Sequence, residues 1–261
     1  YMLLEGVYNT VITRDILERE KRKDQKNIND VLLLKKIILF LSDNIGSNIS
    51  FSFISNTLIN EGMLDFKGKK GKTSTHTIEN YVNTLTETYL FYEIKRFDIK
   101  GKEYLKTLGK YYISDIGIRN YLLGIRDRDR GHILENIVYF ELLRRGYDVA
   151  IGKIDNKEID FIATNLNEKI YFQVTESLTN EETKQRELDP LMKVKDNYEK
   201  IILSLNQEAP ANIIEYLRGL SRLLPYYIIQ FLVFQKGTWP ENIIHITNVA
   251  RFEQYPLWSI E

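Results

Sequence analysis

The chain has 261 residues, of which 36 are basic and 36 acidic, so its formal net charge is zero and its pI is near 7.1. This balance excludes a surface that attracts nucleic acid over its whole area, and any such attraction must be local. The absence of cysteine excludes disulfides, thiolate metal sites and a cysteine nucleophile, and it suits the reducing cytoplasm in which we expect the protein to work.

Residues 28–123 are predicted to form a winged helix, which is a helix-turn-helix followed by a β-ribbon. The expected elements are an apolar helix over 31–42, a second helix from 51, a third over 76–90 and a wing strand over 91–97. Ser50 is a suitable N-cap for the second helix, and Thr73 begins a run of hydroxyl side chains before the third.

A nucleic-acid interface is predicted at the start of the third helix. Four lysines precede it without an intervening acid, and small polar side chains open the helix itself. The predicted contacts are Lys67, Lys69, Lys70, Lys72, Ser74, Thr75, His76 and Asn80. Helix starts approach phosphate and asparagine can read adenine, so DNA is the expected partner. The alternative is a winged helix that only packs against protein.

The same basic segment contains a partial nucleotide-binding motif. Gly71, Lys72 and Thr73 match the end of a Walker A loop, but Phe66 stands where the first glycine should be. The segment is a charged loop, whereas a P-loop leaves a buried strand and opens a helix. We therefore expect no ATPase activity from this chain.

Residues 124–131 are predicted to link two units. Five consecutive charged residues lie between Arg126 and Arg130, and Gly131 follows them. We interpret this segment as a solvated hinge. The alternative is that Arg126, Arg128 and Arg130 bind phosphate or an acidic partner.

The second unit, residues 132–205, begins with an amphipathic helix that Gly146 ends and that carries Glu135 in its first turn. Alternation then predicts strands over 158–163 and 170–175, each with one polar face, joined as an antiparallel hairpin. That hairpin sets Asp160 beside Gln173. The expected donors for a hard cation such as Mg²⁺ are Asp160, the Gln173 side chain and the carbonyl of Val174. An ordinary hairpin with a solvated polar face is the alternative.

Glu135, Asp160 and the run Gln173-Val174-Thr175 resemble the helix Glu, the Asp and the E/Q-x-K element of the PD-(D/E)xK nuclease-like superfamily. The resemblance implies Glu135, Asp160 and Gln173 as catalytic residues and Mg²⁺ as the cofactor. Thr175, however, stands where that superfamily has its lysine. Loss of one electrostatic stabiliser costs a factor of roughly 10² to 10³ in rate, so we expect a degenerate site unless Lys153 or Lys157 reaches in.

Four longer stretches resemble a bacterial and archaeal family of AAA-type ATPases whose C-terminal half is a domain of unknown function. They are YMLLEGVYNTVITRDILER, NYVNTLTETYLFYEIKRFDIKGKE, KYYISDIGIRNYLLG and TNEETKQRELDPLMKVKDNYEKIILSL, and the resemblance covers 3–205. It implies a P-loop ATPase domain, then a winged helix, then a nuclease-like module. The chain is thus expected to be a fragment, with 1–27 as the end of the ATPase or lid region and the ATPase domain itself missing.

Residues 206–261 are expected to form an atypical C-terminal tail. The apolar run 224–234 is only about half the roughly 20 residues that span a bilayer, so we expect a buried strand and no membrane partner. The three histidines, His76, His132 and His245, are too far apart for a zinc pattern, and His132 suits a polar role at a helix start.

The sequence therefore predicts an α/β (α+β) protein, with an N-terminal winged helix-turn-helix followed by a PD-(D/E)xK nuclease-like αβ sandwich. Three functions remain open. The first is nucleic-acid binding with weak or absent cleavage, and the second is a metal-dependent DNase with a displaced catalytic lysine. The third is a structural or protein-interaction module on which the missing ATPase acts.

Overall fold

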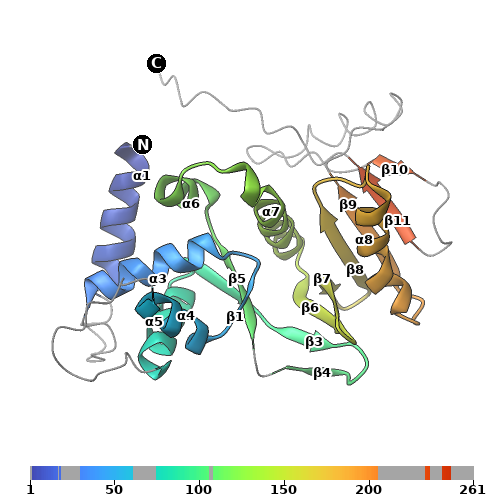
Figure 1. Cartoon of the computed structure of the whole chain (residues 1–261), viewed down its shortest axis with the longest axis horizontal. Coiled ribbons are helices and arrows are strands. Elements are labelled where there is room, and N and C mark those ends of the chain that lie inside the picture. The colour runs from blue at the N-terminus through green and yellow to red at the C-terminus, as the bar shows by residue number, and fades with distance from the viewer. Residues whose placement is uncertain are drawn as a thin grey trace, which may run out of the picture.

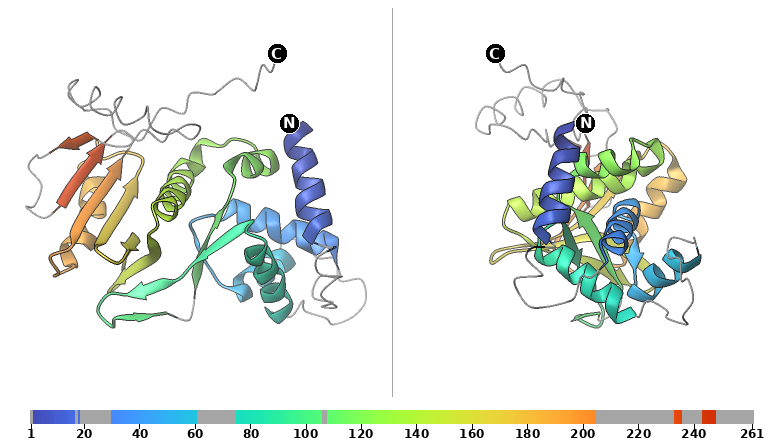
Figure 2. Two further views of the ribbon diagram at one scale, coloured as in Figure 1. Left: turned by 180° about the vertical axis from the view of Figure 1, so that it is seen from behind. Right: turned by 90° about the vertical axis from the view of Figure 1, so that its left-hand side faces the viewer.

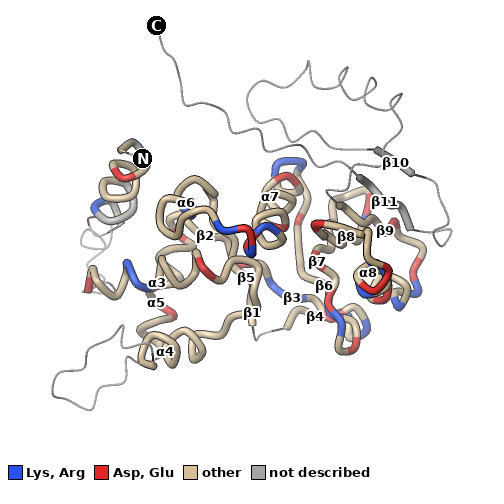
Figure 3. The backbone as a smooth tube through the Cα atoms, turned by 45° about the horizontal axis from the view of Figure 1, so that its top comes forward, with Lys and Arg blue, Asp and Glu red and all other residues tan. Residues whose placement is uncertain are grey.

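The computed structural model describes residues 2–16, 18, 30–60, 75–105, 108–204, 233–235 and 243–247. Most of the helices gather at one end of the molecule, and most of a large sheet, with one helix on it, lies at the other (Figure 1). The mixed class of helices and sheets predicted from the sequence is confirmed. Basic and acidic positions are interspersed along the described chain (Figure 3), in keeping with its zero net charge.

The first unit is built from helices around a three-stranded antiparallel sheet of order β1-β5-β2. Its elements are α1 (Met2–Val7), the π-helix η1 (Tyr8–Asp15), α3 (Val31–Asp43), β1 (Asn48–Ile49), α4 (Phe51–Asn60), α5 (Thr75–Glu87), β2 (Phe91–Ile94), β5 (Gly109–Ile113) and α6 (Ile116–Leu123). The carboxylate of Asp30 caps α3 by accepting from the backbone N–H groups of Leu32 and Leu33. The order of helices and strands is the one that a winged helix needs, and that assignment stays a prediction.

The predicted wing does not stand free. Its chain continues from β2 into β3 (Arg96–Asp98) and returns through β4 (Glu103–Tyr104), and β3 pairs in parallel with a strand of the second unit. Figure 2 shows this ribbon running from the helices to the large sheet. The expected β-ribbon is thus divided, since its base lies in one sheet and its tip forms the edge of another.

The second unit is a sheet of order β10-β11-β9-β8-β7-β6-β3-β4 with helices packed on both faces. Its further elements are the 3-10 helix η2 (Asp127–Asp129), α7 (Arg130–Arg144), β6 (Asp148–Ile154), β7 (Lys157–Thr164), β8 (Lys169–Thr175), α8 (Glu181–Lys193), β9 (Glu199–Ser204), β10 (Val233–Gln235) and β11 (Ile243–Thr247). Gly146 takes φ +83° and ends α7 as predicted. The antiparallel hairpin of β7 and β8 is also as predicted.

The alternative interpretation, a solvated polar face on this hairpin, is wrong. Residues 159–163 are all buried, because α7 covers one face of the sheet and α8 covers the other. The alternation predicted over 158–163 puts Ile159 and Phe161 on one face, yet they belong to different core clusters. A register irregularity in the β6–β7 pairing, where Gly152 faces Ile159, separates them.

Strand β5 lies between the two cores and contributes side chains to both. Its alternation places Tyr111 and Ile113 in the core of the first unit, and Tyr112 in the core under α7. The side chain of Asn136 on α7 fixes the contact, because it accepts from the Ile113 N–H at 2.9 Å and donates to the Ile113 carbonyl at 3.0 Å. The amide therefore makes the two hydrogen bonds that the backbone of a neighbouring strand would make with Ile113.

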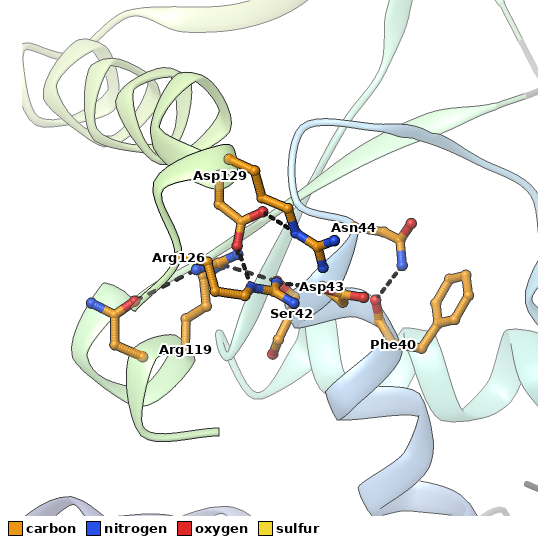
Figure 4. Close-up of polar contacts among 9 residues, drawn as sticks. Phe40, Ser42, Asp43, Asn44, Arg119, Arg126 and Asp129 are labelled. Carbon is orange, nitrogen blue, oxygen red and sulfur yellow. Dashed lines mark hydrogen bonds and ion pairs between the residues drawn. The ribbon is translucent and has the colours of Figure 1, made fainter. Parts of the chain in front are cut away.

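The segment 124–131 is largely exposed, but Arg126 and Asp129 tie it to the first unit. Asp129 is buried and accepts from Arg119 and Arg126 at 2.6 Å each, and Arg126 also pairs with Asp43 of α3 (Figure 4). Arg119 is 1% exposed and donates to the Ser42 carbonyl as well. Arg128 and Arg130 lie largely in solvent, with side chains 72% and 56% exposed, so Arg126 is the arginine of this segment that fastens it to α3.

The two ends of the chain contribute to these cores in different ways. Tyr8 and Ile16, from the predicted ATPase or lid region, pack in the core of the first unit. At the other end, β11 pairs in parallel with β9 and extends the sheet, while most of 206–261 lies outside the described residues. Among the helices that the structure describes, none is long and apolar enough to cross a bilayer.

Candidate functional site

The structure brings Asp160 of β7 and Gln173 of β8 together, as predicted. The Gln173 Oε1 lies 3.4 Å from the backbone N of Asp160, and the Asp160 Oδ2 accepts from the backbone N–H of Val174 at 2.7 Å. The part of Val174 that meets the carboxylate is therefore its N–H, not the carbonyl expected as a metal ligand. Asp160 and Gln173 are 9% and 6% exposed, so both side chains are nearly sealed from solvent.

Glu135 approaches the same place from α7. The helix begins at Arg130, earlier than predicted, so Glu135 lies in the second turn and not in the first. Its Oε2 accepts from the hydroxyl of Tyr112 at 2.8 Å, and His132 Nδ1 lies 3.7 Å from its Oε1. The role foreseen for His132 at the helix start thus includes contact with the predicted site residue Glu135.

A cation that sequence reasoning missed lies against Glu135 and Glu158. Lys110 of β5 places its Nζ 2.5 Å from Glu158 Oε1 and 3.6 Å from Glu135 Oε2, and its side chain is only 6% exposed. Glu158 Oε2 also accepts from the side chain of Asn48 at 3.0 Å. The signal in the sequence was a lysine inside the otherwise apolar strand GKYYI, on the same strand face as Tyr112.

The two lysines expected to replace the missing cation point elsewhere. Lys153 lies 3.7 Å from Asp98 and Lys157 lies 3.3 Å from Asp189, in both cases at partly exposed pairs. Thr175, at the lysine position of the motif, is buried, and its hydroxyl lies 3.4 Å from the Ser177 carbonyl. The positive charge of the cluster therefore comes from the first unit.

Burial and mutual repulsion set the protonation of the cluster. Burial raises the pKa of Asp160 well above its ordinary value, and the nearby Glu135 raises it further, which outweighs the opposing effect of Lys110. Burial lowers the pKa of Lys110, but Glu135, Asp160 and Glu158 together raise it above its ordinary value. The cluster thus holds a charged ammonium and a carboxyl group that favours its neutral form.

Gln173 is held on its other side by α8. Its Nε2 donates to Glu187 Oε2 at 2.8 Å, and Arg186 donates to the other oxygen of Glu187 at 2.9 Å. Glu187 is itself buried. Both ends of the Gln173 amide are therefore engaged within the protein.

The present donor set does not fit Mg²⁺. That ion needs near-octahedral oxygens at about 2.0–2.1 Å. The Gln173 amide and Asp160 Oδ2 are already committed to hydrogen bonds, and the ammonium of Lys110 stands among the carboxylates. Over the described ranges, no group of three or more His, Cys, Asp or Glu side chains is arranged to hold a metal ion.

The predicted nucleic-acid interface is only partly described. Lys67, Lys69, Lys70, Lys72 and Ser74 lie outside the described residues. Thr75 and His76 are exposed at the start of α5, and Asn80 is half-buried one turn later. His76 Nδ1 lies 3.7 Å from Glu79 Oε2. Beside this helix start is a hollow of about 630 Å³, whose lining includes Lys95.

Comparison with known proteins gives relatives without an assigned function. Residues 2–129 match a family described as Domain of unknown function (DUF8612). The chain is similar to an uncharacterized protein of Haemophilus influenzae, with 43% identity over 202 residues that cover 77% of this chain and 46% of that protein. It is also similar to an uncharacterized protein of Methanocaldococcus jannaschii, with 28% identity over 235 residues that cover 86% and 49% respectively. No solved structure matches the chain.

The chain spans about half the length of these curated relatives. The matched range 2–129 covers the first unit and ends where α7 begins, so the carboxylate cluster draws Lys110 from inside that range and Glu135 from outside it. What the comparisons support is a domain of unknown function with uncharacterized relatives.

Proposed function

We propose that this chain is a nucleic-acid-binding module of a longer AAA-type ATPase-like protein, and that its nuclease-like site is degenerate. The observation that carries the proposal is the position of Lys110. Its ammonium lies against Glu135 and Glu158, among the side chains that a working site would turn toward a metal and a phosphodiester. Asp160 and Gln173 are assembled beside it but nearly buried, so DNA has little access to them.

Support for nucleic-acid contact comes from the first unit. Helices α3 to α5 with the sheet β1-β5-β2 follow the winged-helix order, and α5 begins with the exposed side chains of Thr75 and His76. The lysine-rich segment 67–72 directly precedes this helix. Because the wing tip is incorporated in the second sheet, contact falls to the helix start and the basic segment.

A titration of labelled duplex at two salt concentrations tests the binding. With about three or four phosphates neutralised, log K should fall with log salt at a slope of roughly −3. The triple variant Lys69→Ala, Lys70→Ala, Lys72→Ala should lose most of its low-salt affinity. A matched control triple, Lys153→Ala, Lys157→Ala and Lys193→Ala, removes the same charge from β6, β7 and α8 of the second unit and should bind as the wild type does. Absence of binding at low salt would favour the purely structural module.

A cleavage assay tests the degenerate site. Wild type and Asp160→Asn should be indistinguishable on single- and double-stranded DNA with Mg²⁺ or Mn²⁺. The second candidate, a metal-dependent DNase with a displaced lysine, is favoured by the same Lys110, because it supplies the cation that Thr175 lacks. Cutting by wild type that disappears in both Asp160→Asn and Lys110→Met would establish this second candidate.

A further inference from the structure

The carboxylates around Lys110 form a closed ionic cluster that joins the two units. Glu158 comes from β7 and Glu135 from α7, while Lys110 reaches them from β5. The side chains of Asn48 and Tyr112, both from the first unit, donate to the same two carboxylates. The cluster is therefore a contact between units as well as the remnant of a site.

We propose that the ammonium of Lys110 is the built-in counter-ion of this cluster, and that beside Glu135 it balances the charge that the nuclease-like resemblance assigns to a divalent cation. This inference rests on the proposed degenerate site and deepens it. The first unit thereby supplies the charge that holds β5 against α7 and β7.

The donors around the cluster support an internal cation over a metal. Glu135 Oε2 accepts from Tyr112 at 2.8 Å, Glu158 Oε2 accepts from Asn48 at 3.0 Å, and Asp160 Oδ2 accepts from Val174 at 2.7 Å. Each carboxylate already has a protein donor. A divalent ion would have to displace the ammonium, because like charges a few ångströms apart in a buried site repel strongly.

The position of Lys110 gives a clear consequence for its removal. Its side chain is 6% exposed, and that of Glu135 is 14% exposed. Lys110→Met keeps most of the methylene length but removes the charge, so Glu135 loses the lysine beside it, while Glu158 keeps only Arg96, whose Nε lies 3.9 Å from its Oε2. A divalent cation should then be able to take the vacated position and restore the balance of charge.

Thermal unfolding of the full chain, with EDTA or with millimolar Mn²⁺, tests this. The wild-type midpoint should be the same in both conditions. The Lys110→Met midpoint should fall in EDTA by on the order of 10 °C, and Mn²⁺ should recover at least half of that loss. The matched control Lys157→Met, which removes a lysine from a partly exposed pair, should behave as the wild type does.

Three results would overturn the inference. The first is a wild-type midpoint that Mn²⁺ raises as much as it raises that of Lys110→Met. The second is a Lys110→Met midpoint as high as the control, and the third is a loss that Mn²⁺ does not reverse. If Lys110→Met does not fold, the double variant Lys110→Met, Glu158→Gln should fold in EDTA because it removes one charge of each sign, and its failure to fold would refute the role of charge. The readout is independent of DNA, so a negative binding titration leaves this test intact.

Discussion

Replacement of Asn136 by leucine should weaken the contact between α7 and β5 and lower the free energy of unfolding. Asn136 is 2% exposed and satisfies both the N–H and the carbonyl of Ile113, at 2.9 and 3.0 Å. Leucine has a similar shape but no polar atoms, so Asn136→Leu leaves two buried backbone groups without their side-chain partner. Each unsatisfied group costs about 1–3 kcal/mol, so we expect a loss of about 2–6 kcal/mol in the free energy of unfolding.

Urea denaturation measures this loss as a shift in midpoint at constant slope. The matched control is Asn83→Leu on the exposed face of α5, where a surface change should stay within about 0.5 kcal/mol. An Asn136→Leu variant within about 1 kcal/mol of the control would refute the reasoning, because water or a neighbouring group would then satisfy Ile113. A larger loss accompanied by a changed slope would indicate separate unfolding of the two units.

Three further predictions concern protonation, the buried arginine and a close approach. Because the pKa of Asp160 lies above its ordinary 3.8, its stabilising contribution is complete below that value and is lost as the pH rises through the folded-state pKa. The stability of Asp160→Asn relative to wild type should therefore increase with pH, at a limiting slope of about 1.4 kcal/mol per pH unit. Denaturation series between about pH 4 and pH 8 measure this difference. A difference that does not change with pH would contradict the prediction. Arg119→Met should cost about 3 kcal/mol, because Asp129 loses its buried arginine partner and keeps the half-buried Arg126. Lys100→Met, at an exposed pair, should change little, and equal losses would argue against burial as the cause. Gly46→Ala should lower the unfolding midpoint, since this residue has φ +71° and an added Cβ would lie 2.9 Å from an imidazole nitrogen, and an unchanged midpoint would mean that the loop shifts freely.

The sequence by itself determined the local elements and one close pair of the site. Apolar periodicity and turn residues predicted α3, α7 and the β7–β8 hairpin, because these depend on the nearest neighbours along the chain. The hairpin in turn placed Asp160 beside Gln173, since a short connection between alternating strands leaves few choices of register. Gly146 ended its helix as expected for the same local reason.

Only the tertiary structure decided which charged side chains are buried and which residues they pair with. The charges of 124–131 suggested a solvated hinge, but Asp129 is enclosed by Arg119 and Arg126, because α3 packs across the segment. Likewise, alternation in β7 and β8 suggested a polar face, whereas helices on both sides bury it.

Lys110 illustrates the same limit most clearly. Periodicity can place a lysine on one side of β5, but it carries no information about which distant strand or helix that side will meet. The contacts with Glu135 and Glu158 arise because the wing tip joins the second sheet and α7 docks on β5 through Asn136. Such pairings depend on how separate units pack together, and the free energy that fixes them is spread over residues far apart in the chain.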